Sequence, residues 1–296
     1  MNKLVYDIGG SSIKYAIMSD EAIVIERGSE NTPLDSFENF IAVVKKIYDC
    51  HKDKVDGIAI SAPGTIDPKS GLILAPGALS FNYKVNLIDK IHEFTTYPVS
   101  IENDGKCAAL AESWIGNLSN CKSGIVMVLG TGIGGGIILD GKLWSGSHFF
   151  AGEFSYLAQG EITGFENVFA LKGSATALIM EFAKAKEIDF QTVDGKKVFE
   201  LIVAEDEHAI SALKKVAHNL ALEMYNLQCI FDPEKICIGG GISQQPFLIE
   251  EIKKELDTIY SKLPFEVPHV IVENCKFYND SNLIGALRNY ELNKKL

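Results

Sequence analysis

Residues 4–18 read LVYDIGGSSIKYAIM, and the interpretation of the rest of the chain starts from them. An apolar run at 4–8 ends in two glycines, and a second apolar run at 13–18 follows after two serines. Short apolar runs separated by Gly and Ser are typical of a β-hairpin. A further apolar run at 22–25 extends the hairpin into a predicted β-meander.

The turn inside this hairpin has the composition of a phosphate-binding loop. Glycines let the backbone approach an oxyanion closely, hydroxyls and amides donate hydrogen bonds, and a lysine adds positive charge. The expected phosphate-binding residues are Gly9, Gly10, Ser11, Ser12 and Lys14. An ordinary glycine-rich hairpin with an exposed lysine is the alternative. The turn is neither a Walker loop nor a Rossmann fingerprint, because it lacks GKS/T and a directly following helix.

Downstream of the meander, predicted helices and strands alternate. Apolar residues at helical spacing predict a helix over 36–48, and an apolar run at 57–62 predicts a strand. The alternation continues with a helix at 87–94, a strand at 99–101 and a helix at 104–114. The first part of the chain is therefore expected to be an α/β domain.

A second strand-turn-strand unit follows at 125–139, with the glycine-rich turn Gly130-Thr131-Gly132 between its two apolar runs. Its likeness to residues 4–18 suggests a duplicated α/β domain. Two anion-binding turns from two halves of a duplicated fold can hold a polyphosphate between them. Further helices are predicted over 175–184, 197–203, 208–231 and about 246–261.

A third glycine run, Gly239-Gly240-Gly241, follows a predicted strand at 235–238. Without side chains, these residues would let an adenine or a ribose lie close to the backbone. A flexible turn is the alternative interpretation.

Composition excludes several classes of protein. The 296 residues include 28 Lys and Arg against 39 Asp and Glu, and the net charge of −11 disfavours nucleic acid as a partner. The N-terminus lacks the continuous apolar core of a signal peptide, so a cytoplasmic location is expected. The longest uncharged stretch, 123–139, contains six glycines and fits a hairpin better than a membrane helix. Six cysteines without a CxxC or CxC pair fit neither a disulfide scaffold nor a zinc site.

Six motifs occur in the order found in the ROK family of sugar kinases, which the chain resembles from about residue 3 to 288. They are DIGGSSIK at 7–14, SAPGTID at 61–67, END at 102–104, LGTGIGGG at 129–136, AGE at 151–153 and IGGGIS at 238–243. The resemblance implies the actin-like ATPase (RNase H-like) fold, with two α/β domains around a central cleft. A small domain would then span 1–102, completed by a C-terminal helix at about 280–296, and a large domain would span 103–279.

The resemblance assigns Asp104 as the general base. Phosphoryl transfer to a hydroxyl requires an acceptor oxygen that is held in line and relieved of its proton, and a carboxylate within hydrogen-bond reach can do both. A helix-capping role is the alternative for Asp104, although the preceding Asn103 is itself a plausible N-cap. ATP with Mg²⁺ is the implied phosphoryl donor, bound by the three glycine-rich turns.

The sugar-binding residues implied by the family are Gly64, Asn103, Asp104, Glu153 and Tyr156. Amide and carboxylate groups of this kind can hydrogen-bond sugar hydroxyls. Asp7 resembles the acidic residue that orients magnesium through water beside the phosphates. A homodimer is also expected from the family.

The chain departs from many family members after its AGE motif. Those members continue with Ile-Gly-His and a cysteine-rich zinc knot, whereas this chain has Phe154, Ser155 and Tyr156, and 157–180 contains no cysteine. No zinc is therefore expected. His148 is the histidine nearest to the proposed sugar site, and a place in a surface loop is expected for it.

These departures resemble the zinc-free β-glucoside kinases, which phosphorylate the 6-hydroxyl of the non-reducing glucose in cellobiose-type sugars. Tyr156 would offer an aromatic face and a hydroxyl to the aglycone, with a core aromatic as the alternative. N-acetylmannosamine kinase, glucokinase and fructokinase remain open. A non-catalytic sugar sensor is disfavoured because the base and the phosphate turn are both present. Family repressors carry a helix-turn-helix domain ahead of the phosphate turn, for which no room is expected before Asp7.

Overall fold

The computed structural model describes residues 2–161, 164 and 167–294. Contacts within the chain divide it into two compact units. Unit 1 comprises Met1–Trp114, Ser145–Ala151 and Asn279–Leu296, and unit 2 comprises Ile115–Trp144 and Gly152–Tyr278. The domain boundary at 102 that the sequence suggests stays a prediction. Residues 162–163 and 165–166 of the segment expected to lack zinc, and 295–296 of the expected C-terminal helix, lie outside the described residues.

Unit 1 contains a five-stranded sheet with the order β3-β2-β1-β4-β7. Its strands are β1 (Asn2–Ile8), β2 (Ser12–Met18), β3 (Val24–Asn31), β4 (Val55–Ala62) and β7 (Val99–Asn103). The predicted meander is confirmed, because β2 pairs antiparallel with both β1 and β3. The strands β4 and β7 extend the sheet in parallel with β1. A separate antiparallel pair consists of β5 (Thr65–Asp67) and β6 (Leu72–Ala75).

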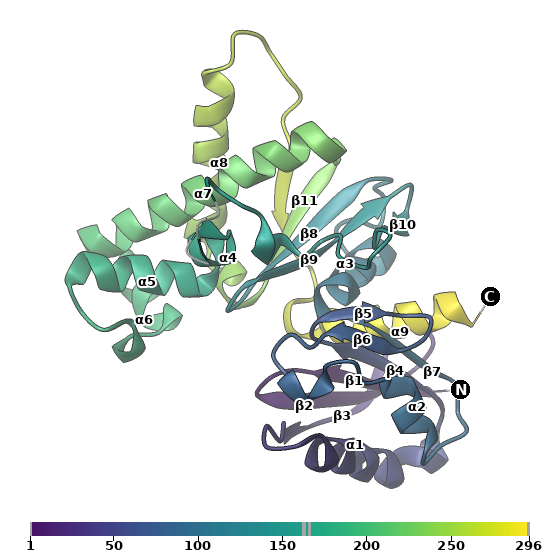
Figure 1. Ribbon diagram of the computed structural model, residues 1–296. Helices are drawn as coiled ribbons and strands as arrows, with labels where there is room; N and C mark the ends of the chain where they lie inside the picture. The colour runs from purple at the N-terminus through teal and green to yellow at the C-terminus, as the bar shows by residue number, and fades with distance from the viewer. Residues whose placement is uncertain (1, 162–163, 165–166, 295–296) are drawn as a thin grey trace. The chain divides into compact units, whose positions relative to one another are not determined.

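Two successive residues of β1 contact two different helices of unit 1. The helices of this unit are α1 (Phe37–His51), α2 (Leu87–His92), α3 (Asp104–Ile115, in unit 1 as far as Trp114) and α9 (Ser281–Asn293). Tyr6 donates from its hydroxyl to Val44 O of α1 at 3.0 Å, whereas Asp7 accepts from Asn282 of α9. Successive side chains of a strand point to opposite faces, so α1 and α9 cover opposite faces of the sheet (Figure 1).

The crossing of α9 and α3 depends on Gly285. A Cβ atom at this position would lie 1.7 Å from Cys107 O, so any side chain there would push the two helices apart. This close crossing brings the start of α9 to the sheet beside Asp7.

Unit 2 repeats the sheet of unit 1, with the order β10-β9-β8-β11-β12. Its strands are β8 (Gly124–Leu129), β9 (Ile133–Leu139), β10 (Lys142–Leu143), β11 (Lys235–Gly239) and β12 (Ile271–Asn274). As in unit 1, the first three strands of the chain order pair antiparallel and the last two extend the sheet in parallel. The predicted α/β duplication is therefore present in the strand order.

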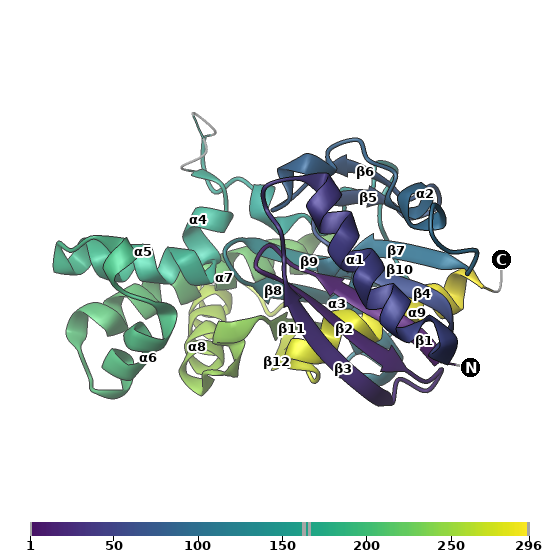
Figure 2. The same ribbon diagram turned by 90° about the horizontal axis from the view of Figure 1, so that it is seen from below.

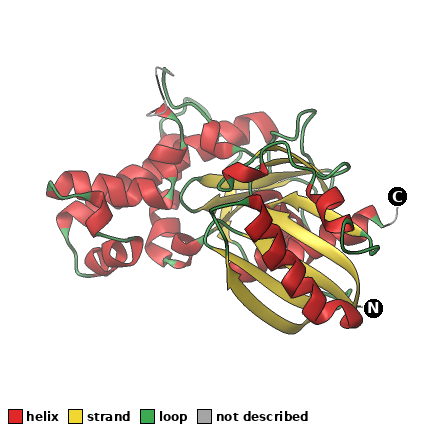
Figure 3. Cartoon of the chain, turned by 60° about the horizontal axis from the view of Figure 1, so that its bottom comes forward, coloured by secondary structure: helices red, strands yellow, loops and turns green. Residues whose placement is uncertain are grey.

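The helices described in unit 2 are α4 (Ala170–Gly173), α5 (Ala175–Lys186), α6 (Gly195–Val203), α7 (Glu207–Phe231) and α8 (Pro246–Ser261). Four of them follow the predicted segments closely, whereas the short helix α4 was not predicted. The side chain of Asp206 caps α7 by accepting from the N–H groups of His208 and Ala209. Figure 2 shows α5, α6 and α7 packed together, and Figure 3 distinguishes these helices from the strands. Among the described residues, no helix combines the length and apolar character needed to cross a membrane.

Candidate active site

The predicted phosphate turn of unit 1 connects β1 to β2. A hydrogen bond of 2.9 Å from Gly9 N to Ser12 O closes the turn. Thr32, directly after β3, donates from Oγ1 to Gly9 O at 2.7 Å and from N to Ser11 O at 3.2 Å. These bonds occupy two carbonyl oxygens of the turn and so suit a loop that binds an anion through N–H groups. Sequence reasoning missed Thr32, which no local motif marks.

Asp7, which the resemblance links to magnesium, is buried at the end of β1. Its Oδ1 accepts from Ser61 Oγ at 3.2 Å and from Asn282 Nδ2 at 3.0 Å. Lys14 Nζ lies 4.0 Å from Asp7 Oδ2, and its own side chain is 44% exposed. Burial raises the pKa of Asp7, and the hydrogen bond from Asn282 and the charge of Lys14 oppose that shift. Such a carboxylate fits the oxygen ligands that Mg²⁺ accepts directly or through water.

The predicted base lies where β7 ends and α3 begins. Asn103 Oδ1 accepts from Lys106 N at 3.0 Å, so Asn103 is the N-cap residue of α3. Asn103 Nδ2 donates to Gly64 O at 2.9 Å and to Asp104 Oδ1 at 3.1 Å. Gly105 N donates to the same oxygen of Asp104 at 2.8 Å. The half-buried carboxylate of Asp104 is therefore held in place by the first turn of the helix.

Gly64 lies against the last residue of β6 and the segment that follows it, 76–78. Its φ is +102°, and a Cβ atom there would lie 2.0 Å from Ala75 O. In the same segment, the Cβ of Ala78 lies 3.2 Å from the place where a Cβ on Gly10 would be. Contacts therefore run from the phosphate turn through this segment to Gly64, and from Gly64 to Asn103. Unit 1 thus brings together the predicted phosphate-binding, sugar-binding and catalytic residues that it contains.

Glu102, next to this group, is a titratable residue to which sequence reasoning assigned no role. Its side chain is 2% exposed, and Oε1 accepts from Asn103 N at 2.8 Å. Burial raises the pKa of Glu102 to about 7, although the hydrogen bond from Asn103 and the charge of Lys106 lower it. A buried carboxyl group with a raised pKa is therefore hydrogen-bonded to the backbone of Asn103, the residue predicted to bind sugar.

The glycine turn of unit 2 connects β8 to β9 and contacts the AGE segment. Gly130 N donates to Gly132 O at 2.9 Å. Ser155 Oγ accepts from Ile133 N at 2.7 Å, and a Cβ on Gly132 would lie 2.6 Å from this oxygen. Thr131, between the two glycines, is exposed. Ser155 is a second residue that sequence reasoning missed, because its partners are about twenty positions away in the chain.

Two further glycines allow the backbone of the AGE motif and of the third glycine run to lie close to the β8–β9 hairpin. Gly152 has a φ of +90°, and a Cβ there would lie 2.8 Å from Gly135 O. Gly240 also has a φ of +90°, and a Cβ there would lie 2.1 Å from Leu129 O, just before the turn. Gly239 is buried and Gly241 is exposed on either side of it. Unit 2 thus gathers the glycine turn, the AGE segment and the third glycine run.

The aromatic residue after the AGE motif lies at the surface of unit 2. Tyr156 is 53% exposed, so the alternative of a core aromatic is wrong. Glu153 is half-buried. His148 is exposed in a turn, in agreement with the expected surface loop.

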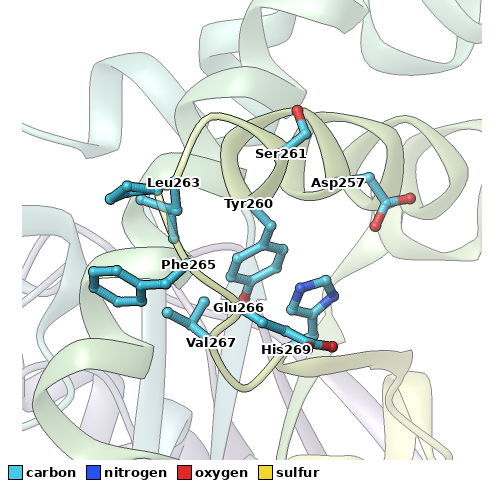
Figure 4. Close-up of a pocket in the computed structure, with 9 residues that line it drawn as sticks. Asp257, Tyr260, Ser261, Leu263, Phe265, Glu266, Val267 and His269 are labelled. Carbon is cyan, nitrogen blue, oxygen red and sulfur yellow. The ribbon is translucent and has the colours of Figure 1, made fainter.

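Metal-ligating side chains do not cluster in the part of the chain that the structure describes, where no three His, Cys, Asp or Glu residues gather. The absence of zinc stays a prediction. Elsewhere in unit 2, a hollow of about 490 Å³ lies at the end of α8, where His269 stacks on Tyr260 (Figure 4). None of the predicted site residues lines it.

Comparison with known proteins identifies relatives along nearly the whole chain. A β-glucoside kinase of Listeria monocytogenes is 31% identical over 294 residues, which are 98% of this chain and 97% of the relative. A solved ROK family protein from Streptococcus pneumoniae, in complex with sucrose, is 27% identical with a TM-score of 0.90, over 100% of this chain and 99% of its own. A solved Listeria monocytogenes protein proposed to be an N-acetylmannosamine kinase is 30% identical with a TM-score of 0.90, over 99% and 100% of the two chains.

The expected actin-like ATPase fold is therefore confirmed by proteins that share it over their full length. The family model described as the ROK family matches residues 4–290. The chain belongs to the ROK family.

Proposed function

We propose that the chain is an ATP-dependent sugar kinase that phosphorylates the 6-hydroxyl of the non-reducing glucose of a β-glucoside such as cellobiose. The observation that carries this proposal is the arrangement in unit 1. There Asp104 is held by Asn103 and Gly105, and Asn103 is held by Gly64, in a chain of contacts that continues to the phosphate turn. A positioned carboxylate beside a phosphate-binding turn is the minimum that phosphoryl transfer to a hydroxyl requires.

In the proposed reaction, Asp104 accepts the proton of the attacking sugar hydroxyl. Asn103 orients the carboxylate, because its Nδ2 donates to both Asp104 Oδ1 and Gly64 O. The second lone pair of Asn103 Oδ1 is the group that would accept a hydrogen bond from a sugar hydroxyl. Lys14 and the N–H group of Gly10 in the turn offset the charge of the phosphates, because the N–H group of Gly9 is taken up in closing the turn. The glycine turns of unit 2 supply further backbone N–H groups to the nucleotide.

Asp7 is the residue that would hold magnesium in this site, directly or through water. Bound Mg²⁺ would neutralise charge that develops on the phosphate oxygens. The hydrogen bonds from Ser61 and Asn282 fix one oxygen of Asp7 and so define how its carboxylate is presented. The fit of this donor set to a hard cation supports the assignment.

The choice of a β-glucoside rests on the relatives and on Tyr156. The similar Listeria protein is a β-glucoside kinase, and the similar Streptococcus protein is in complex with sucrose, a disaccharide. The ring of Tyr156, close in sequence to Glu153, is exposed at the surface and offers a face for a second sugar or an aglycone. N-acetylmannosamine is the second candidate substrate, because a similar solved protein is proposed to act on it.

A coupled assay of ADP formation over a panel of sugars tests the proposal. The panel contains cellobiose, gentiobiose, salicin, glucose, fructose, N-acetylglucosamine and N-acetylmannosamine. We expect the highest kcat/KM with cellobiose, gentiobiose or salicin. Turnover of N-acetylmannosamine or glucose alone would refute the β-glucoside assignment, and absence of ADP with every sugar would refute the kinase. The expected homodimer is tested separately by light scattering.

A further inference from the structure

Lys106 is a buried lysine in the first turn of α3, two residues after the proposed base. Its side chain is 1% exposed, which is rare for lysine because the ammonium group loses its hydration. Its backbone N–H bonds the N-cap Asn103, and no role in the proposed chemistry has yet been given to its side chain. A buried ammonium group requires an acceptor, and the structure shows one.

The acceptor is the backbone carbonyl of Phe149. Lys106 Nζ donates to Phe149 O at 2.7 Å, in the range of a charge-assisted hydrogen bond. Phe149 has a φ of +58°, a left-handed conformation that residues other than glycine rarely adopt. Such a conformation persists where neighbouring contacts hold it, and the bond from Lys106 is a contact of that kind.

Phe149 lies in a short loop that belongs to unit 1, although the chain before and after the loop belongs to unit 2. The loop, Ser145–Ala151, is closed on itself by a hydrogen bond of 3.2 Å from Ala151 N to Ser145 O. Fixing one carbonyl of a closed loop restricts the whole loop. The chain that leaves it enters the AGE motif at once, so Glu153 follows the loop after one residue.

The charge of Lys106 has a counterpart four positions earlier in the chain, in strand β7. Glu102 is buried, and the charge of Lys106 favours its ionised form. Neighbouring opposite charges reduce the cost of keeping an ammonium group away from water. The ammonium group of Lys106 thus interacts electrostatically with Glu102 and donates a hydrogen bond to Phe149 O of the loop.

We propose that Lys106 is a positioning residue for sugar binding: its ammonium group holds the Ser145–Ala151 loop on α3, and with it the chain that leads into Glu153. The inference rests on the proposed function. It adds that the loop is ordered before the sugar arrives, because a side chain of the base helix holds it. Because the loop is already ordered, sugar binding does not have to offset the entropic cost of ordering it, and the affinity for the sugar is higher.

Three substitutions of Lys106 distinguish the contribution of its hydrogen bond from those of its charge and of its aliphatic packing. Lys106→Arg keeps a charged donor, Lys106→Gln keeps a neutral donor, and Lys106→Met keeps the aliphatic length without a donor. Lys276→Met is the matched control, because Lys276 Nζ also donates to a backbone carbonyl, Ile115 O at 2.8 Å, but in an exposed part of unit 2.

Hydrogen–deuterium exchange on the free protein tests the tether without any substrate. In Lys106→Met we expect the amides of Ser145–Ala151 to exchange about tenfold faster, which corresponds to the loss of about 1.4 kcal/mol of local protection. Exchange in β1 should stay unchanged. Lys106→Arg and Lys276→Met should protect the loop as the wild type does. Unchanged exchange of the loop in a folded Lys106→Met protein would overturn the proposal; if that variant does not fold, unchanged exchange in Lys106→Leu, which also lacks a donor, would do so.

Steady-state kinetics test whether the tether serves the sugar. We expect Lys106→Met to raise the KM for the sugar about tenfold while the KM for ATP changes less than about twofold, with rescue by Lys106→Arg. Equal changes in both KM values, or an unchanged KM for the sugar despite a loosened loop, would contradict the positioning role. Absence of activity in the wild type would instead refute the proposed function, and the exchange result would still decide whether the tether exists.

Discussion

The two hairpins that carry the glycine turns have the same backbone plan and different side chains. In each hairpin we compare the cross-strand pair that is second from the turn. In unit 1 this pair is Asp7 with Lys14, and in unit 2 it is Val128 with Gly134. Both turns are closed by a backbone hydrogen bond of 2.9 Å that starts at the first glycine. The two hairpins thus share antiparallel pairing and a hydrogen-bonded turn, although the closing bond runs from Gly9 to Ser12 in unit 1 and from Gly130 to Gly132 in unit 2, and this pair is charged in unit 1 alone.

This difference suggests a division of work between the units. The acidic and basic groups with proposed roles in phosphoryl transfer, Asp7, Lys14 and Asp104, belong to unit 1, and Gly130, Gly132 and Gly240 of unit 2 offer backbone. Substitutions in unit 1 should therefore change the chemical step. Substitutions in the glycine turns of unit 2 should change nucleotide binding.

The largest effect is expected from Asp104→Asn, which keeps the shape of the side chain and removes the base. We expect kcat to fall by roughly a hundredfold or more, while the dissociation constant of the sugar, measured by calorimetry, changes only slightly. Asp140→Asn, at an exposed turn of unit 2, is the control and should leave kcat unchanged. Near-normal turnover of Asp104→Asn would remove this residue from its role.

A somewhat smaller effect is expected from Asp7→Asn. The substitution removes the charge that would attract magnesium and keeps a side chain that Ser61 and Asn282 can still contact. We expect the magnesium concentration for half-maximal rate to rise on the order of 10- to 100-fold, with the KM for the sugar unchanged. The same magnesium dependence as in the wild type would mean that Asp7 does not serve the metal.

A pH-dependent effect on stability is expected from Glu102→Gln. Because burial raises the pKa of Glu102 from its ordinary value of 4.5 to about 7 in the folded protein, the protonated form favours folding. This contribution is complete below pH 4.5 and is lost as the pH rises through about 7. Urea unfolding should show that the wild type loses on the order of 2 kcal/mol more stability than Glu102→Gln between pH 5 and pH 8. Parallel pH profiles would contradict a raised pKa.

The smallest effect is expected from Gly130→Ala in unit 2, with Gly135→Ala as the contrasting substitution. A Cβ on Gly130 meets nothing within 4 Å, whereas a Cβ on Gly135 would lie 2.1 Å from Val126 O. Gly130→Ala should therefore leave the free energy of unfolding within about 0.5 kcal/mol of the wild type and raise the KM for ATP a few-fold. Gly135→Ala should lower stability by about 1–3 kcal/mol. An unchanged KM for ATP in Gly130→Ala would contradict the proposed contact between this turn and the nucleotide.

Local sequence signals predicted the elements of the fold and the glycine turns, and the resemblance to the ROK family supplied the roles of the other candidate site residues. Glycine turns between apolar runs identified both hairpins, and the residue type and position of Asn103 predicted its capping role. The contacts that fix the site depend instead on pairs far apart in the chain. Asn282 bonds Asp7 across 275 positions, and Lys106 bonds Phe149 across 43. Periodicity and spacing carry no information on such pairs, because the fold alone brings them together.

The most direct test is the identity of the product. Wild-type protein is incubated with ATP, Mg²⁺ and cellobiose, Asp104→Asn is treated in parallel, and phosphorus–proton correlation spectra are recorded. We expect one new phosphate ester on the 6-oxygen of the non-reducing glucose with the wild type, and almost none with Asp104→Asn over the same time. A phosphate ester at another position, equal amounts of ester from the two proteins, or no phosphorylated sugar would contradict the proposed reaction.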